Sequence, residues 1–165
     1  MNSGIPKKVI PMNENHKPAI MKILQGTIEF KPVEVDTAEE LIDSYLAEGI
    51  SSGFHLLVAE VGSEISGYIC YGPTPLTEST WDIYWMAVAP AKKGQGIGTS
   101  LLKTAEHNIK QRNGLIILIE TSSTDGYELT RKFYQRSGYE VISRIPDFYS
   151  MGDGLVIFHK RLDRV

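Results

Sequence analysis

Apolar residues along this chain follow two periodicities, one typical of strands and one typical of helices. Residues 81–89 read WDIYWMAVA and are apolar on both faces after the first residues, which predicts a central strand covered on two sides. Over residues 97–109 the apolar side chains recur at helical spacing, with polar residues on the other side. A short, basic, glycine-rich segment separates the two. We expect the rest of the chain to be organised around this strand–loop–helix unit.

Further apolar runs and helix-end signals complete the predicted architecture. Six more strands are expected, at residues 8–12, 54–61, 65–71, 115–119, 139–144 and 155–159. Three more helices are expected: one capped by Asn13 or Asn15 that ends near Gly26, one from residue 36 to Gly49, and one over about residues 125–136. This order predicts a mixed α/β fold, and the absence of a linker or repeat predicts a single domain over residues 1–165.

Some of these boundaries depend on single residues. Pro32 is expected to interrupt an irregular stretch before the second helix, because proline lacks a backbone donor. Thr37 and Glu40 have the spacing of a capping box, which fixes the predicted start of that helix. Glu120 should lie just after the strand that ends at residue 119. The last two strands should be joined by a loop over residues 145–154.

The glycine-rich segment has the features of an anion site. It reads Lys92-Lys93-Gly94-Gln95-Gly96-Ile97-Gly98-Thr99. Glycines allow the backbone to approach a ligand closely, and the first turn of a helix has free N–H groups and a positive dipole end. A phosphorylated ligand, and a pyrophosphate in particular, fits these features better than the alternative, a turn that only connects a strand to a helix.

Two common phosphate motifs fit the segment poorly. A P-loop would end in Gly-Lys-Ser or Gly-Lys-Thr, which the chain lacks. The dinucleotide fingerprint is a closer rival, because Gly94 and Gly96 match its first two glycines and Glu120 lies at about the right distance for a ribose contact. However, Thr99 replaces the third glycine, and four residues separate the strand from the first. A nucleotide-dependent oxidoreductase is therefore disfavoured.

The segment resembles the acyl-CoA signature of the GNAT superfamily of N-acetyltransferases, Gln/Arg-x-x-Gly-x-Gly/Ala. Lys93 stands in the first place, which keeps the charge but not the planar fork of arginine. The stretch Met86-Ala87-Val88-Ala89-Pro90 also resembles the strand end that precedes this loop in the superfamily. The similarity runs to the C-terminus, through about half of the chain, and is closest to the ribosomal-protein alanine acetyltransferases. It implies acetyl-CoA as co-substrate and the fold of that superfamily.

The resemblance also implies which residues contact the cofactor. The backbone of Met86 and Val88 would pair with the pantetheine arm, and an N–H near Met86 or Ala87 would bind the oxyanion. The phosphates would lie on the loop. An asparagine that often contacts the cofactor is replaced here by Tyr127, which has no amide to offer. The cofactor-binding candidates are therefore Met86, Ala87, Val88, Lys93, Gly94, Gln95, Gly96, Ile97, Gly98, Thr99 and Tyr127.

Acetyl transfer from a thioester needs a neutral amine, an oxyanion donor and a proton for the thiolate. Tyr134 begins a Tyr-x-x-x-Gly-Tyr element that resembles the superfamily's general acid, and a phenol with a pKa near ~10 is protonated at neutral pH. Two carboxylates are candidate bases. Glu120 resembles the strand-end glutamate of the alanine acetyltransferases, and Asp82 occupies the place of the base glutamate in histone acetyltransferases. Each could instead be an ordinary strand-end carboxylate.

The amine acceptor is expected between residues 27–35 and residues 146–154. Phe148 and Tyr149 lie in a stretch that resembles the Asp-Tyr-Tyr…Asp-Ala segment of the alanine acetyltransferases, although simple packing under a hairpin would explain them equally well. The other candidates are of two kinds. Some are aromatic residues that would line the acceptor cleft, and one is an acid whose charge would attract an amine. The acceptor-binding set is Glu29, Phe30, Tyr84, Phe148 and Tyr149.

Composition excludes several other classes. A formal net charge of −3 gives no electrostatic reason to bind nucleic acid. No run approaches ~18 apolar residues, so no membrane span is expected and a cytoplasmic enzyme is the default. The four histidines have no cysteine or acid at ligand spacing, so no metal is expected. Cys70 lies in an apolar strand and reads as a packed residue rather than a nucleophile.

These features predict an N-acetyltransferase that uses acetyl-CoA in a ternary complex, without a covalent intermediate. The expected acceptor is a small primary amine, and a protein N-terminus is the runner-up. A second class, a non-catalytic acyl-CoA-binding module, would bind the cofactor without turning over an amine. Acetyltransferases of this size often pair, so the resemblance allows a homodimer, without an interface assigned by the sequence.

Overall fold

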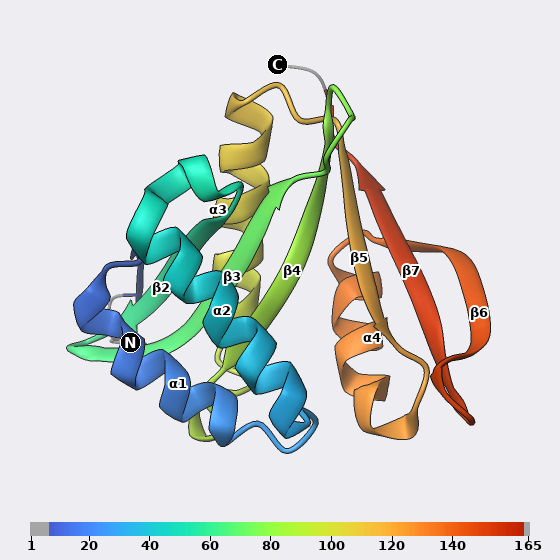
Figure 1. Cartoon of the computed structure of the whole chain (residues 1–165), viewed down its shortest axis with the longest axis horizontal. Helices are drawn as coiled ribbons and strands as arrows, with labels where there is room; N and C mark the ends of the chain where they lie inside the picture. Colours follow the sequence, from blue (N-terminus) through green and yellow to red (C-terminus); the bar gives the residue numbers. More distant parts are fainter. Residues whose placement is uncertain (1–6, 164–165) are drawn as a thin grey trace, which may run out of the picture. The chain divides into compact units, whose positions relative to one another are not determined.

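The computed structural model describes residues 7–163, and the elements follow the predicted order (Figure 1). Seven strands form one mixed sheet in the order β1-β2-β3-β4-β5-β7-β6. The α/β prediction is therefore confirmed. The elements are β1 (Lys7–Pro11), α1 (Lys17–Gln25), α2 (Pro32–Glu48), β2 (His55–Val61), β3 (Glu64–Pro73), β4 (Thr80–Val88), α3 (Ile97–Gln111), β5 (Ile116–Ser122), α4 (Glu128–Arg136), β6 (Glu140–Ser150) and β7 (Asp153–Arg161).

Contacts divide the chain into two compact units. The first contains, within the described range, residues 7–72 and 85–108, and the second contains residues 73–84 and 109–163. The prediction of a single domain stays a prediction. No helix within residues 7–163 is long and apolar enough to cross a membrane.

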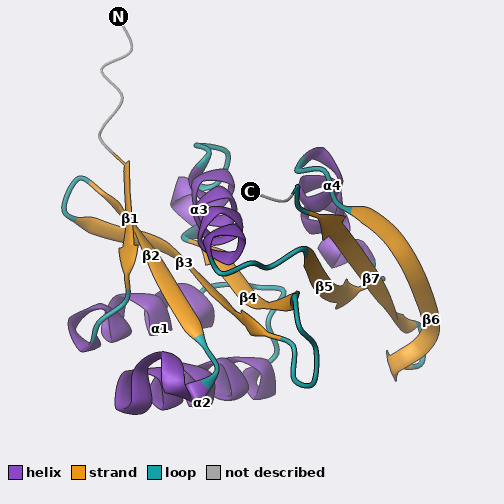
Figure 2. Cartoon of the chain, turned by 90° about the horizontal axis from the view of Figure 1, so that it is seen from above, coloured by secondary structure: helices purple, strands orange, loops and turns teal. Residues whose placement is uncertain are grey.

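In the first unit, helices cover both faces of the antiparallel strands β1, β2 and β3. Helices α1 and α2 lie on one face and α3 on the other (Figure 2). Lys17 of α1 ties the two helices of the first face together through Asp43 of α2, at 2.5 Å. The core of that face consists of Met12, Ile20, Ile23, Leu24, Val35, Ala38, Ile42, Leu56, Val58, Tyr68, Cys70 and Ala87.

Gly67 of β3 allows the start of α3 to pack closely on the opposite face. A Cβ atom at this position would lie 2.9 Å from the carbonyl oxygen of Ala87, 3.1 Å from Leu101 and 3.3 Å from Ile97. Two of these neighbours belong to α3 and one to the end of β4. The absence of a side chain at Gly67 therefore sets the distance between the sheet and the helix that follows the glycine-rich loop.

Gly67→Ala is expected to lower the free energy of unfolding by about 1–3 kcal/mol, because an added methyl group overpacks the core against a backbone carbonyl. Chemical denaturation would measure the loss. Gly126→Ala is the matched control, since a Cβ at Gly126 would meet no atom within 4 Å. Equal stability of the two variants would show that the neighbours of Gly67 accommodate an added methyl group without a loss of stability.

The second unit combines a parallel and an antiparallel strand pair. Residues Thr80–Ile83 of β4 run parallel to Ile116–Ile119 of β5, and β7 is antiparallel to both β5 and β6. Helix α4 lies against β5 and β7 (Figure 1). Tyr134 of α4 packs on Phe158 of β7, with ring centroids 5.8 Å apart.

Helix α2 begins four residues earlier than predicted, and Pro32 is its first residue rather than a breaker. Proline suits this position because its fixed φ is helical and its missing donor would be unpaired there in any case. Glu34 caps the helix by accepting a hydrogen bond from the backbone N–H of Lys31 at 2.7 Å. The predicted capping residue Thr37 instead lies inside the helix and donates to the carbonyl of Val33 at 2.8 Å.

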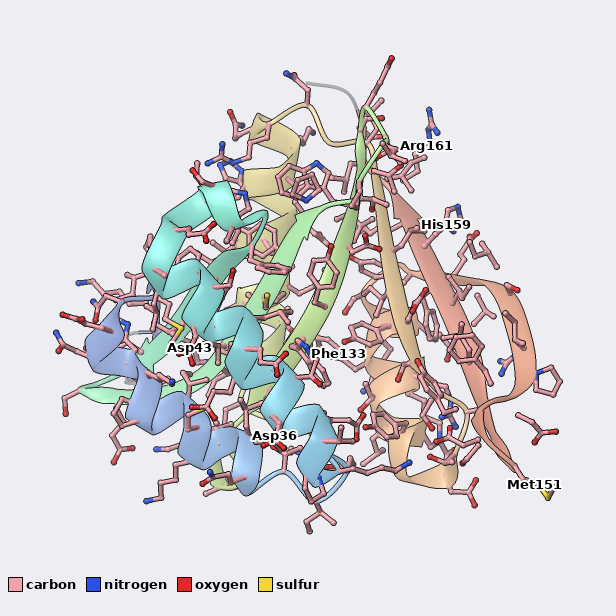
Figure 3. All side chains as sticks on the ribbon, in the orientation of Figure 1. Asp36, Asp43, Phe133, Met151, His159 and Arg161 are labelled. Atoms are coloured by element: carbon pink, nitrogen blue, oxygen red, sulfur yellow. The ribbon has the colours of Figure 1, made fainter. Side chains whose placement is uncertain are left out.

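The predicted loop over residues 145–154 is also wrong. Strand β6 continues to Ser150, and only Met151 and Gly152 form the turn to β7, with the Met151 side chain at the hairpin tip (Figure 3). The pairing with β7 is irregular between Ile145 and Ser150, where Asp147 has a φ of 54° and accepts a hydrogen bond from the Gly152 N–H at 2.6 Å. This local irregularity explains the loop-like sequence.

Candidate active site

The glycine-rich loop lies between β4 and α3, in the first unit. Gly94 and Gly96 both have a φ of +76°, a region that favours glycine. The carbonyl of Gly96 accepts hydrogen bonds from the backbone and the hydroxyl of Ser100, both at 3.0 Å, which starts the helix. The N–H groups of the first helical turn have no partner within a helix. The loop therefore presents backbone donors together with the positive end of α3.

Three lysines surround this loop. Lys92 contacts Glu64 at 3.4 Å, and Lys93 contacts Glu29 at 3.8 Å. Lys7 of β1 donates a hydrogen bond from Nζ to the carbonyl oxygen of Gln95. Three lysine charges face two carboxylates, so one positive charge beside the loop is not balanced by these contacts, and both ion pairs are long and partly exposed.

The other predicted cofactor residues occupy the two ends of this segment. Ile97 is only 1% exposed, so its backbone N–H rather than its side chain is available to a ligand. Gly98 and Thr99 lie in the first turn of α3. At the end of β4, Met86 and Val88 are half-buried and Ala87 is buried. All of these residues belong to the first unit.

Two predicted acceptor residues belong to the same unit. Glu29 lies beside the cofactor loop through its contact with Lys93. Phe30 packs edge-on against Trp85 of β4, with ring centroids 5.4 Å apart and an interplanar angle of 84°. The structure thus brings the segment between α1 and α2 to the loop and to the strand that precedes it.

The proposed acid, Tyr134, lies on α4 in the second unit. Its side chain is 6% exposed, and its ring is held among those of Phe133, Tyr139 and Phe158. Burial raises the pKa of the Tyr134 phenol above its ordinary value. The hydroxyl is therefore protonated throughout the neutral range and suits a proton donor.

The two candidate bases have different surroundings. Asp82 of β4 accepts a hydrogen bond from the hydroxyl of Thr74 at 2.5 Å, which ties the end of β3 to β4. Glu120 lies inside β5, two residues before its end, and not after the strand as predicted. Its side chain is exposed, and its backbone faces Ile157 of β7. Glu120 is the more accessible carboxylate.

The remaining predicted residues lie in the second unit. Tyr127 ends the short 3-10 turn Asp125–Tyr127, directly before α4. Tyr84 is 37% exposed on β4. Phe148 and Tyr149 are 53% and 48% exposed and contact each other edge-on at 5.0 Å. They are exposed on a strand rather than packed under the hairpin.

Several residues near the candidate site carry no sequence signal. Lys7 contacts Gln95 and Trp85 contacts Phe30 across long stretches of sequence. Thr74 contacts Asp82 across the connection between β3 and β4. Ser122 likewise donates to the carboxylate of Asp153 at 2.5 Å and so fixes an acid at the start of β7. Only the folded structure reveals these contacts, since nothing in the local sequence of these residues marks them.

Burial makes Cys70 a poor nucleophile. Cys70 is 1% exposed, and burial raises the pKa of its thiol, so the reactive thiolate is disfavoured. Within residues 7–163, no group of three or more His, Cys, Asp or Glu side chains is arranged to hold a metal ion.

Comparisons with known proteins agree with this geometry. Residues 52–141 match the family model of the acetyltransferase (GNAT) domain. An uncharacterised N-acetyltransferase of Methanocaldococcus jannaschii is 33% identical over 110 residues, which span 63% of this chain and 64% of the relative. The chain therefore aligns with somewhat less than two thirds of that relative's length.

Solved structures extend the similarity over nearly the whole chain. A protein from Desulfovibrio desulfuricans, assigned to the GNAT family of acetyltransferases, is 34% identical, with a TM-score of 0.91 over 94% of this chain and 99% of that one. An aminoglycoside 6′-N-acetyltransferase, crystallised with coenzyme A, has a TM-score of 0.76 over 96% and 99% of the two chains. At 19% identity, the latter shows the fold alone.

Proposed function

Because the chain belongs to the GNAT family of acetyltransferases, we propose that it transfers the acetyl group of acetyl-CoA to a primary amine. The observation that carries this proposal is the loop before α3, where two glycines with positive φ and surrounding lysines present an anion site at a helix N-terminus. Acetyl-CoA carries the pyrophosphate that such a site would bind.

The proposed reaction is direct. The neutral amine attacks the thioester carbon, a C–N bond forms, and the C–S bond breaks. The leaving thiolate takes a proton from Tyr134, and the excess proton of the amine passes to Glu120, directly or through water. A backbone N–H near Met86 or Ala87 would stabilise the oxyanion. The buried thiol of Cys70 supports a route without an acetylated cysteine.

A small-molecule amine is our proposed acceptor, with Glu29, Phe30, Tyr84, Phe148 and Tyr149 as the residues that would contact it. A protein N-terminus is the alternative, because the exposed aromatic pair at the end of β6 could hold a peptide. A non-catalytic acyl-CoA-binding module would keep the loop without the acid and the base. Homodimerisation and a cytoplasmic location stay predictions.

An acceptor panel tests this proposal. Release of the CoA thiol would be followed with acetyl-CoA and, one at a time, polyamines, amino acids, aminoglycosides and short peptides with a free N-terminus. Turnover of a small amine at a rate well above acetyl-CoA hydrolysis supports the proposal. Turnover of peptides alone would favour the protein acceptor, and cofactor binding without any turnover would favour the non-catalytic module.

The choice of base gives a separate prediction. Glu120→Gln is expected to lower kcat/KM by about 10²-fold or more at neutral pH, because general-base catalysis contributes about 10²–10⁴-fold. The deficit should shrink at alkaline pH, where hydroxide can accept the excess proton of the amine in place of Glu120. Asp82→Asn is the matched control, since an asparagine can still accept the Thr74 hydrogen bond. A larger loss in Asp82→Asn would assign the base to Asp82 instead.

A further inference from the structure

The first strand of the sheet begins beside the glycine-rich loop. Lys7 pairs with Val61 of β2, and Val61 pairs with Glu64 of β3. Glu64 contacts Lys92, the first residue of the glycine-rich segment. The strand register therefore places the start of β1 at the same end of the sheet as the loop, although Lys7 and Gln95 lie 88 residues apart in sequence.

Alternation along β1 directs Lys7 toward the loop. Ile10 and Met12 pack with the core of the α1–α2 face, so Lys8 shares that face and Lys7 shares the face of α3. The Nζ of Lys7 donates to the carbonyl of Gln95, and a Cβ built on Gly96 would lie 3.4 Å from it. The ammonium group therefore lies against the backbone of the loop.

From this contact we propose that Lys7 is a positioning residue of the coenzyme phosphate site, an inference that rests on the proposed function. In a trans peptide the carbonyl and the following N–H point in opposite directions. By holding the Gln95 carbonyl, Lys7 directs the Gly96 N–H to the other side of the peptide plane. The loop then presents a fixed donor to a phosphate oxygen.

Lys7 also adds a positive charge that its own partner does not neutralise. Lys92 and Lys93 face the carboxylates of Glu64 and Glu29, whereas the partner of Lys7 is an uncharged carbonyl oxygen. A charged donor also binds its acceptor more tightly than a neutral one, by roughly twofold in energy. Both effects favour a pyrophosphate on this loop.

Binding of coenzyme A to Lys7→Met and Lys7→Arg, measured by calorimetry, tests the inference. Lys7→Met removes the donor and the charge, and we expect a dissociation constant about tenfold higher. Lys7→Arg retains both and should stay within about threefold of the wild type. Lys8→Met is the matched control, because it removes the same charge from the neighbouring position on the other face, and it should bind coenzyme A like the wild type.

A second ligand shows whether Lys7 acts at the pyrophosphate or at the ribose phosphate of coenzyme A. If Lys7 acts at the pyrophosphate, the Lys7→Met loss should be equal for coenzyme A and 3′-dephospho-coenzyme A, which lacks only the ribose phosphate. A loss seen with coenzyme A alone would overturn this assignment. Equal binding by Lys7→Met and Lys8→Met would overturn the role of Lys7 itself. A wild-type protein that binds neither ligand would instead refute the proposed function.

Discussion

Replacing Tyr134 with phenylalanine is expected to lower kcat for amine acetylation by about 10²–10³-fold and to leave acetyl-CoA affinity within about twofold, because only the proton donor to the leaving thiolate is lost. The aromatic ring, which packs on Phe133, Tyr139 and Phe158, is retained. Steady-state kinetics with the best acceptor, together with a direct binding measurement, would separate the two effects.

Tyr139→Phe is the matched control for this variant. Tyr139 belongs to the same aromatic cluster and is 2% exposed, so the change removes a hydroxyl from the same surroundings. Its kcat should remain within a few-fold of the wild type. Equal rates for Tyr134→Phe and the wild type would remove Tyr134 from the mechanism.

The pH dependence follows from the direction of the pKa shift. Burial raises the pKa of Tyr134, so the protonated form, which is the active form of an acid, persists to higher pH than in a free phenol. Loss of this proton should therefore not reduce kcat below about pH 10. A fall in kcat at pH 8–9 that disappears in Tyr134→Phe would contradict this expectation.

Gly96→Asp is expected to weaken coenzyme A binding by about 100-fold or more. The new carboxylate would repel the phosphates and, from its position beside Lys7, would neutralise a cation of the site. The φ of +76° also disfavours any side chain, so the loop would lose the geometry of several charge-assisted hydrogen bonds, worth about 1.5–3 kcal/mol each. Calorimetric titration with coenzyme A measures the loss.

Gly53→Asp separates backbone strain from the effect on the site. Gly53 has a φ of +87° in the turn before β2, and a Cβ there would meet no atom within 4 Å. Both variants should lose about 1–2 kcal/mol of stability, because a left-handed conformation is costly for a residue with a side chain. Only Gly96→Asp should lose coenzyme A binding. If Gly96→Asp still bound coenzyme A like the wild type, the phosphate site would lie elsewhere.

The sequence predicted the elements whose signals are local. The glycines of the loop, the apolar spacing of α3 and the Gly49 stop of α2 each identify a structure without reference to the rest of the chain. The prediction for Pro32 was wrong because proline can either interrupt a helix or begin one. Which of the two occurs here depends on the cap that Glu34 supplies to the N–H of Lys31. The length of β6 depended on irregular pairing with β7, which local sequence does not encode.

The candidate site likewise combines features that the local sequence predicts with contacts that depend on the fold. The loop could be predicted because its function requires glycines at fixed spacing. The contact of Lys7 with Gln95 could not, since it depends on the register of β1 with β2 and β3. The pairing of Glu29 with Lys93, and that of Asp82 with Thr74, likewise join segments whose proximity only the folded chain establishes.

The use of acetyl-CoA is the central claim, and thermal unfolding with acetyl-CoA, coenzyme A, NAD⁺ and ATP, added separately, tests it most directly. A ligand at about 100 times its dissociation constant stabilises the folded state by roughly 2.7 kcal/mol, a shift of a few degrees for a chain of this size. We predict that acetyl-CoA and coenzyme A raise the unfolding temperature and that NAD⁺ and ATP do not. Stabilisation by NAD⁺ alone, or by none of the four, would contradict the assignment of this loop to acetyl-CoA.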